Sequence, residues 1–475
     1  MSQTASITSS SGTFTGLLHE NGQTSYRGIR FAHAKRWEAP VDVATYDQPV
    51  DATKYGFMSP QVPGFLEQML GTDSSDMSED CLFLNVYCPA GATDASNLPV
   101  MYWIHGGAYT NGAGSVAWYD GSRLASRGVI VVSINYRLGA FGFAGTGNYG
   151  VLDMLSGLRW VQRNIAAFGG NPGNVTIFGE SAGGSAVVSL MATDAATNLF
   201  HKAWAMSPSI GQLRNLSRGQ ELEAQLLEIL DADSLSTASS YSVDKILEAQ
   251  TAAALVPSQG FDVFAPTGGG DQIASDILEA AALCPIPFVV GTNRDENKLW
   301  SSFNQEAASD GQPEWEKFTN DIFGDKAPVA RETYESHRPG EAARELISAV
   351  NTDISFRQPA QSLAESRAAS VTPAWMYWFT WASPAFGGIL GSCHALDIPF
   401  AFDNLDAPGA DFLLGTDEDR QTLATRFADE LVQFASHGHP SWEQFNTQQR
   451  PTLVLNIQAE IAKDPEADIR QLFGR

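Results

Sequence analysis

Cysteine is scarce in this chain. Only four of the 475 residues are cysteines, and none lies near a histidine or another cysteine at the spacing of a metal site. Cys81 and Cys88 flank an apparent strand that would hold them roughly 23 Å apart, too far for a disulfide. We therefore predict free thiols, as is typical of a reducing compartment. Cys393 stands beside His394 and has to be considered as a nucleophile, although adjacent side chains usually point apart.

Long apolar runs and positive charge are also lacking. No run reaches the length of a membrane span, and residues 1–12 have neither the basic nor the apolar region of a signal peptide. Lysine and arginine number 29 against 54 aspartates and glutamates, which gives a net charge of −25. So acidic a surface argues against nucleic acid or an anionic membrane as a partner. We therefore expect a cytoplasmic protein.

The most informative stretch combines a strand, a tight turn and a helix. An apolar, β-branched run after Asn174 predicts a buried strand. The chain then passes through Gly179-Glu180-Ser181-Ala182-Gly183 into a predicted helix over Ser185–Met191. A Gly-x-Ser-x-Gly turn in this context is typical of a nucleophile elbow, which presents Ser181 at the start of a helix. The alternative is a glycine-rich turn with a solvent-exposed serine, and the flanking strand and helix favour the elbow.

Strands and helices alternate along the chain. Continuous apolar runs predict strands buried on both faces of a parallel sheet, and these runs are Asp80–Tyr87, Leu98–Ile104, Val129–Ile134, Lys202–Ser207, Cys284–Asn293 and Ala374–Trp381. Helical spacing extends over Gly150–Phe168. Near the N-terminus, Asn21-Gly22 between two strand-like runs predicts a hairpin. The order predicts an α/β fold, with a large, mostly parallel central sheet flanked by helices. Together with the nucleophile elbow, it leads us to expect the α/β-hydrolase fold.

We expect a single domain over residues 1–475, because the sequence has no internal repeat and no low-complexity linker. Helical excursions are predicted near residues 211–285 and 297–370, and helices are expected to close the chain, notably over 417–436. An irregular stretch, residues 56–77, contains an apolar segment. That segment is either part of a lid or binding wall, or a surface loop with an apolar anchor.

A serine nucleophile needs a base within hydrogen-bond reach, and the base needs an acid that orients it. In α/β-hydrolases the chain order is serine, acid, histidine. Glu296 follows a core strand, and His394 lies in a glycine-rich loop after another strand. We therefore predict Ser181, Glu296 and His394 as the catalytic residues. Asp295 is an alternative acid, and Asp397 is either a second alternative or a support.

An acyl-transfer site also needs donors for its oxyanion. The loop His105-Gly106-Gly107-Ala108 follows a core strand, where such a loop belongs in this fold. We predict that the backbone N–H groups of Gly107, Ala108 and Ala182 form the oxyanion hole. A plain turn is the alternative, and the elbow downstream disfavours it.

Several segments together match one family, from about residue 26 to residue 400. They are Tyr26-Arg27-Gly28-Ile29, Ser78–Tyr87, His105–Tyr109, Asn135–Gly139, Phe168–Pro172, Gly179–Gly184, Asn293–Glu296 and His394–Phe400. In these segments the chain resembles the type-B carboxylesterase/cholinesterase family, in particular its bacterial para-nitrobenzyl-esterase-like members. The resemblance implies that Glu296 is the triad acid, that Ser207 supports it, and that no cofactor is used.

Three departures from the family pattern carry information. The cysteine that relatives often pair with the one at Cys81 is absent upstream, so that disulfide cannot form. Residues 56–80 lack the tryptophan with which cholinesterases bind choline, so choline esters are not expected as preferred substrates. The oxyanion loop reads Gly-Gly-Ala where many relatives have three glycines. The family links this loop type to esters of bulky, even tertiary, alcohols.

The expected function is therefore a serine carboxylesterase that acts through an acyl-enzyme on small to medium, apolar or aromatic esters, as a monomer or small homo-oligomer. Phe65, Tyr109 and Trp300 are candidates for the substrate pocket, although most aromatic residues near the motifs are expected in the core. Two alternatives stay open. One is a non-catalytic binding protein, and the other is hydrolysis of an amide, carbamate or thioester.

Overall fold

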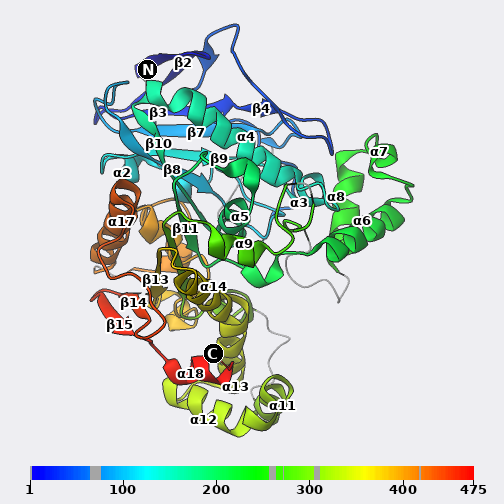
Figure 1. Cartoon of the computed structure of the whole chain (residues 1–475), viewed down its shortest axis with the longest axis vertical. Helices are drawn as coiled ribbons and strands as arrows, with labels where there is room; N and C mark the ends of the chain where they lie inside the picture. Colours follow the sequence, from blue (N-terminus) through cyan, green and yellow to red (C-terminus); the bar gives the residue numbers. More distant parts are fainter. Residues whose placement is uncertain are drawn as a thin grey trace.

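The computed structural model describes residues 3–64, 76–255, 264–270, 272–303, 311–416 and 419–474. Within them, one large sheet of thirteen strands runs through the molecule (Figure 1). Its central strands are parallel in the order β9 (Ile130–Ile134), β8 (Leu98–Ile104), β10 (Gly170–Glu180), β11 (Lys202–Met206), β12 (Phe288–Asn293) and β13 (Ala374–Phe379). This arrangement is the α/β-hydrolase fold predicted above.

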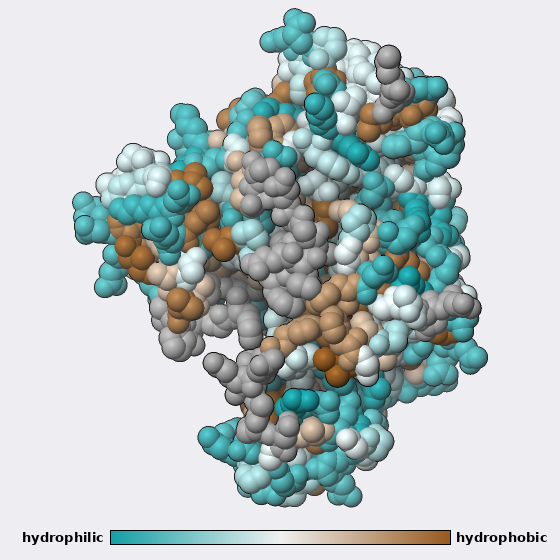
Figure 2. Space-filling model, turned by 180° about the vertical axis from the view of Figure 1, so that it is seen from behind, coloured by the Kyte–Doolittle hydropathy of each residue, from teal (hydrophilic) through white to brown (hydrophobic). Residues whose placement is uncertain are grey.

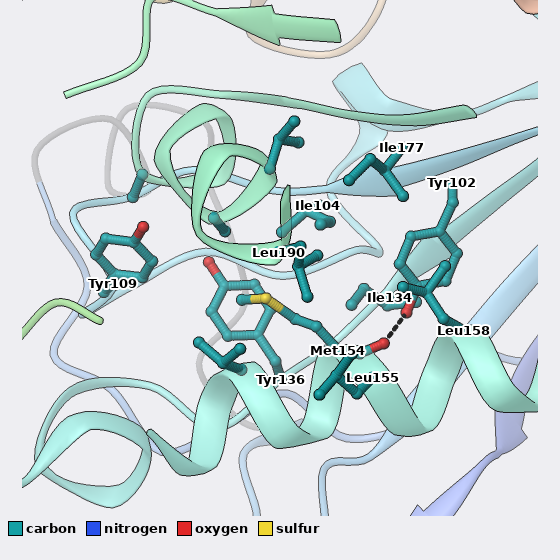
Figure 3. Packing of buried hydrophobic residues seen from close by; sticks show 14 of the residues in the cluster. Tyr102, Ile104, Tyr109, Ile134, Tyr136, Met154, Leu155, Leu158, Ile177 and Leu190 are labelled. Atoms are coloured by element: carbon teal, nitrogen blue, oxygen red, sulfur yellow. Dashed lines mark hydrogen bonds between the residues drawn. The ribbon is translucent and has the colours of Figure 1, made fainter. Parts of the chain in front are cut away.

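The central strands are apolar on both faces because both faces are covered. Along β8, Tyr102 and Ile104 belong to one buried cluster, whereas Met101 and Trp103 belong to another. Helices α4 (Tyr149–Asn164) and α5 (Ala182–Met191) cover the first face, and α17 (Arg420–His437) covers the second. On the first face Tyr102 packs against α4 and donates a 2.9 Å hydrogen bond to the carbonyl of Met154 (Figure 3).

Antiparallel strands extend the sheet at both edges. On the N-terminal side, β1 (Gln3–Ser9), β2 (Gly12–Leu18), β3 (Thr24–Arg30) and β7 (Phe83–Cys88) continue it, with β6 (Val50–Asp51) beside β2. The short strands β4 (Ala32–His33) and β5 (Val41–Asp42) pair separately. The β2–β3 pairing confirms the hairpin expected at Asn21-Gly22, and β7 begins three residues later than predicted.

At the C-terminal edge the expectation of helices alone was wrong. After α17 the chain forms β14 (Pro451–Leu455), parallel to β13, and β15 (Glu460–Lys463), antiparallel to β14. The apolar run of β14 is too short to distinguish a strand from a helix by its pattern. Only its pairing with β13 decides the conformation. Helix α18 (Ala467–Leu472) does follow as the last element.

The two helical excursions are present. The first contains α6 (Leu216–Leu230), α7 (Leu235–Ala238), α8 (Val243–Ala254) and α9 (Ile277–Leu283). The second contains α10 (Lys298–Ser301), α11 (Gln312–Phe323), α12 (Ala327–His337), α13 (Ala343–Thr352) and α14 (Gln358–Ala369). Helices α11, α12, α13 and α18 pack around Trp315 and Tyr334 in a core of their own. We call this group the helical lobe; it lies at the end of the molecule away from the N-terminal strands (Figure 1).

All four cysteines are free, as predicted, and Cys81, Cys88 and Cys393 are buried. No helix of the described residues is long and apolar enough to cross a membrane. The face shown in Figure 2 is mostly hydrophilic, with apolar residues gathered in a few patches. This distribution agrees with the strongly acidic composition of the chain.

Candidate active site

Ser181 occupies a strained turn between β10 and α5. Its backbone has φ 58° and ψ −122°, a conformation that costs energy for a residue with a Cβ atom. The turn is held by close packing, because a Cβ atom on Gly183 would lie 2.0 Å from the carbonyl oxygen of Ile104. The backbone N–H of Ser181 donates to the carbonyl of Met206 on β11, at 2.9 Å. This is the geometry of the predicted nucleophile elbow.

The loop after β8 lies against this turn. A Cβ atom on Gly106 would be 3.2 Å from the Cβ atom of Ser181, so the two backbones approach closely. Gly107 has φ 101°, and a Cβ atom there would strike the carbonyl oxygen of Asn111 at 2.3 Å. Ala108 also has a positive φ, of 51°. Within the described residues, the backbone N–H groups of Gly107, Ala108 and Ala182 donate to no backbone carbonyl. They therefore remain available as donors to an oxyanion.

His105, which precedes the glycines, has a structural role. Its ring stacks on Tyr136 with centroids 4.5 Å apart, and its Nδ1 is 2.8 Å from the carbonyl oxygen of Gly106. Burial lowers the pKa of His105 to about 4, so the imidazole is neutral at physiological pH. It shapes the loop rather than contributing a charge.

His394 and Glu296 are in direct contact, as predicted. The Nδ1 atom of His394 lies 2.6 Å from Oε2 of Glu296, and both side chains are buried. The other carboxylate oxygen of Glu296 accepts a 2.7 Å hydrogen bond from the backbone N–H of Asn293. Because both oxygens are held, the carboxylate can fix the tautomer and the orientation of the imidazole.

Neither alternative acid contacts the imidazole through a hydrogen bond among the described residues. Asp295 instead forms a buried ion pair with Arg338, at 2.5 Å. Asp397 is also buried, and it accepts hydrogen bonds from Asn293 Nδ2, at 3.2 Å, and from the Tyr377 hydroxyl, at 3.4 Å. Of the three candidate carboxylates, only that of Glu296 meets Nδ1 of His394.

Glu180 also reaches His394, a contact that the sequence analysis missed. Its Oε1 lies 3.2 Å from Nε2 of His394, and its side chain is buried. The sequence motif did contain a hint of this contact, because Glu180 is the first x of Gly-x-Ser-x-Gly and stands directly before the serine. The contact itself, however, joins two segments far apart in the chain, and no local pattern predicts it.

The buried charges around the imidazole perturb one another. Burial by itself would lower the pKa of His394, but the carboxylates of Glu180 and Glu296 outweigh it and raise the pKa to about 9. Burial raises the pKa of Glu180 to about 8, and burial together with Glu296 raises that of Asp397 to about 7. These groups therefore share protons as one coupled set, and the imidazole gains its charge more readily than an isolated histidine.

Two further expectations concern Cys393 and Ser207. Cys393 is fully buried, and burial raises the pKa of its thiol well above the usual range, which disfavours the reactive thiolate. Ser207 is buried beside the site, but its hydroxyl makes no hydrogen bond to any described residue. The support for Glu296 that the resemblance implied is therefore not made by a hydrogen bond from Ser207.

Two aromatic rings pack against the imidazole. Trp300 lies 5.0 Å from the ring centroid of His394 and is 40% exposed, so its indole is open to solvent beside the site. Phe356 lies 4.9 Å from the same ring and belongs to a π-helical turn, Asp353–Arg357, an irregularity common at functional sites. No sequence motif singles out Phe356.

The structure does not place the other two pocket candidates, Tyr109 and Phe65, beside the imidazole. Tyr109 is fully buried in the core cluster on one face of the sheet (Figure 3). The centroid of its ring lies 4.8 Å from that of Phe143. Phe65 lies outside the described residues, as does most of the apolar segment in residues 62–71. Most aromatic residues near the motifs are core residues, as expected, and among them are Trp103, Trp118 and Phe141.

A strained serine elbow, a buried histidine–glutamate pair and a glycine-rich loop on an α/β-hydrolase sheet define a serine hydrolase. The model of the carboxylesterase family matches residues 3–470, so the chain belongs to that family and is a carboxylesterase.

Individual relatives extend over nearly the whole chain. It is 36% identical to the para-nitrobenzyl esterase of Bacillus subtilis (strain 168), over 95% of both chains. It is 31% identical to the phenmedipham hydrolase of Pseudarthrobacter oxydans, over 94% of both. A solved structure of a PNB esterase superposes with a TM-score of 0.85, covering 98% of this chain and 99% of the other, at 31% identity.

Proposed function

We propose that this carboxylesterase hydrolyses small to medium, apolar or aromatic carboxylic esters with Ser181 as nucleophile, His394 as base and Glu296 as the orienting acid. The observation that carries the proposal is the 2.6 Å contact between His394 Nδ1 and Glu296. The strained elbow reaches the same imidazole, because Glu180, the residue before Ser181, lies 3.2 Å from His394 Nε2. The N–H groups of Gly107, Ala108 and Ala182 are proposed as the oxyanion hole.

The reaction follows from these roles. His394 accepts the proton of the Ser181 hydroxyl as the oxygen attacks the ester carbonyl, and the oxyanion is stabilised by backbone N–H groups. The imidazolium then donates its proton to the leaving alcohol, which leaves an acyl-enzyme. A water molecule, deprotonated by His394, releases the acid. Glu296 stabilises the imidazolium in both halves of the reaction.

The preference for apolar or aromatic groups rests on the surroundings of His394. The rings of Trp300 and Phe356 both lie within about 5 Å of the imidazole, as their centroid distances of 5.0 and 4.9 Å show. Ester groups that pass close to the imidazole would therefore meet aromatic surface. The name of the para-nitrobenzyl esterase relative agrees with an aromatic substrate.

The test is hydrolysis of p-nitrophenyl esters, from acetate to octanoate, by the wild type and by Ser181→Ala. Ser189→Ala is the matched control, because Ser189 is a buried serine of α5, the helix that follows Ser181, and among the described residues its hydroxyl donates only to the carbonyl of Ser185. We expect Ser181→Ala to lose activity by roughly three orders of magnitude or more and the control to keep it. Equal activity of Ser181→Ala and the wild type would refute the assignment.

A cytoplasmic location, a single-domain organisation and a monomeric or small homo-oligomeric state stay predictions from the sequence. Size-exclusion chromatography with light scattering checks the last of these directly.

A further inference from the structure

The acid and the base of the proposed triad come from two loops that are bonded to each other. We call residues 293–297 the acid loop and residues 391–394 the base loop. The backbone N–H of His394 donates to the carbonyl of Glu296 at 3.2 Å, and Asn293 Nδ2 donates to the carbonyl of Cys393 at 2.8 Å. The relative position of the acid and the base therefore depends on contacts between these loops.

Asp295 makes two further connections between the loops. Its backbone N–H donates to the carbonyl of Ser392 at 2.9 Å, and its carboxylate Oδ2 accepts from the N–H of Ser392, also at 2.9 Å. A Cβ atom on Gly391, which has φ 54°, would lie 2.5 Å from the same oxygen. One aspartate thus holds the base loop by two hydrogen bonds and by close packing.

The charge of Asp295 is balanced by the helical lobe. Arg338, at the C-terminal end of α12, places Nη1 2.5 Å from Asp295 Oδ1, and its Nη2 donates to the carbonyl of Arg294 at 3.1 Å. Both side chains are buried. Lys298 Nζ is a more distant cation, 3.7 Å from Asp295 and 3.0 Å from Glu341. Although burial would raise the pKa of Asp295, Arg338 and then Lys298 outweigh it and hold the pKa below its usual value.

We propose that Arg338 is a positioning residue for the triad. It acts through Asp295 to hold the acid loop and the base loop in fixed positions relative to each other. This inference rests on the proposed roles of Glu296 and His394. It also assigns a task to the helical lobe, which supplies the cation that keeps a buried carboxylate ionised one residue from the triad acid.

The expected consequence of losing Arg338 follows from the burial of the pair. With Arg338 removed, Asp295 keeps the more distant cation Lys298, 3.7 Å away, and loses its close partner. A buried carboxylate that is so poorly compensated takes up a proton or draws in water. A protonated or hydrated Asp295 accepts a weaker hydrogen bond from the N–H of Ser392. The base loop then moves relative to Glu296. Small displacements of catalytic groups lower the rate of the chemical step more than they weaken binding.

The experiment compares kinetics per active site in Arg338→Met, Arg338→Lys, Asp295→Asn and the double variant Arg338→Met/Asp295→Asn. A fluorophosphonate probe that labels the active serine counts competent sites, so kcat is corrected for misfolded protein. Arg470→Met is the matched control, because Arg470 is a buried arginine whose guanidinium pairs with Asp464 at 2.7 Å, away from both loops.

We expect Arg338→Met to lower kcat by roughly 10- to 100-fold with KM nearly unchanged. Arg338→Lys should recover part of the loss, because it restores the cation without the planar fork. The double variant should lose less than the product of the two single losses, because it leaves no unpaired buried charge. Arg470→Met should keep its kcat per labelled site even where its thermal midpoint falls.

An unchanged kcat per labelled site in Arg338→Met would overturn the inference, as would equal losses in Arg338→Met and Arg470→Met. If Arg338→Met does not fold, Arg338→Lys and the double variant test the inference instead. A loss of kcat in the double variant equal to the product of the two single losses would contradict a coupled pair. A wild type that is neither labelled nor active would refute the proposed function itself. An active, labelled wild type with insensitive Arg338 variants would refute only the positioning role.

Discussion

Glu180 and His394 are joined by a 3.2 Å contact between Oε1 and Nε2, the imidazole nitrogen not engaged by Glu296. A general base must present this nitrogen to the nucleophile in its neutral form. The residue immediately before the proposed nucleophile therefore competes for the base and, when ionised, favours its inactive protonated form.

Replacing this carboxylate should shift the pH dependence. Ionised Glu180 stabilises the imidazolium and contributes to the raised pKa of His394, about 9. Glu180→Gln removes that attraction, so the pKa of His394 falls and the neutral base persists at lower pH. We predict that the acidic limb of the kcat/KM profile moves to lower pH, measured with a p-nitrophenyl ester from pH 5 to 10. An unchanged limb, or a shift to higher pH, would contradict this role for Glu180.

The elbow should not tolerate a side chain at Gly183. Because a Cβ atom there would meet the carbonyl oxygen of Ile104 at 2.0 Å, Gly183→Ala must displace β8 or α5. We predict a destabilisation of about 1–3 kcal/mol and a loss of kcat larger than the loss of folded protein. Gly211→Ala is the control, since no atom lies within 4 Å of a Cβ atom there. Thermal unfolding and kinetics of both variants check this, and equal behaviour would show that the elbow has more room than the structure indicates.

Trp300 should affect selectivity more than catalysis. Its ring lies 5.0 Å from that of His394 and is partly open to solvent, so an aromatic group of the substrate can stack on it. Trp300→Ala should raise KM for a benzyl ester by roughly 2- to 10-fold and change KM for the matching methyl ester much less. Equal changes for both esters would mean that Trp300 supports the site without contacting the aromatic group.

Cys393 should prove dispensable. The thiol is buried and its pKa is raised by burial, so little thiolate is available at neutral pH. Cys393→Ala is therefore expected to keep kcat within about threefold and to lose about 1 kcal/mol of stability at most. Iodoacetamide should leave the native enzyme active. Loss of activity on alkylation of Cys393 alone would reopen the case for a cysteine nucleophile.

The strands and the catalytic residues could be predicted from the sequence, because the strands follow from runs of apolar residues and the catalytic residues from their order along the chain. The bounds of β8, Leu98–Ile104, match the prediction because the run is rich in β-branched and aromatic residues and ends at a glycine-rich loop, as is typical of a buried strand. The contact between His394 and Glu296 was expected because loops at the carboxyl ends of parallel strands meet at one edge of the sheet.

The features of the site and the fold that were not predicted depend on tertiary contacts, which no local sequence pattern indicates. Glu180 meets His394 although the two residues are far apart in the chain. Phe356 approaches His394 from a π-helical turn. Arg338 directly follows α12, a polar helix whose sequence resembles a solvated surface, yet its guanidinium is buried against Asp295. The strand at Pro451–Leu455 exists because it completes the edge of the sheet beside β13.

The central claim is that Ser181 forms the acyl-enzyme, and trapping tests it most directly. The wild type is incubated with a fluorophosphonate, digested, and the modified residue is located by mass spectrometry while ester hydrolysis is followed in the same sample. The account predicts one phosphonylated residue, Ser181, with labelling that rises in proportion to the loss of activity. Complete inactivation with Ser181 unmodified, or full activity with Ser181 modified, would contradict it.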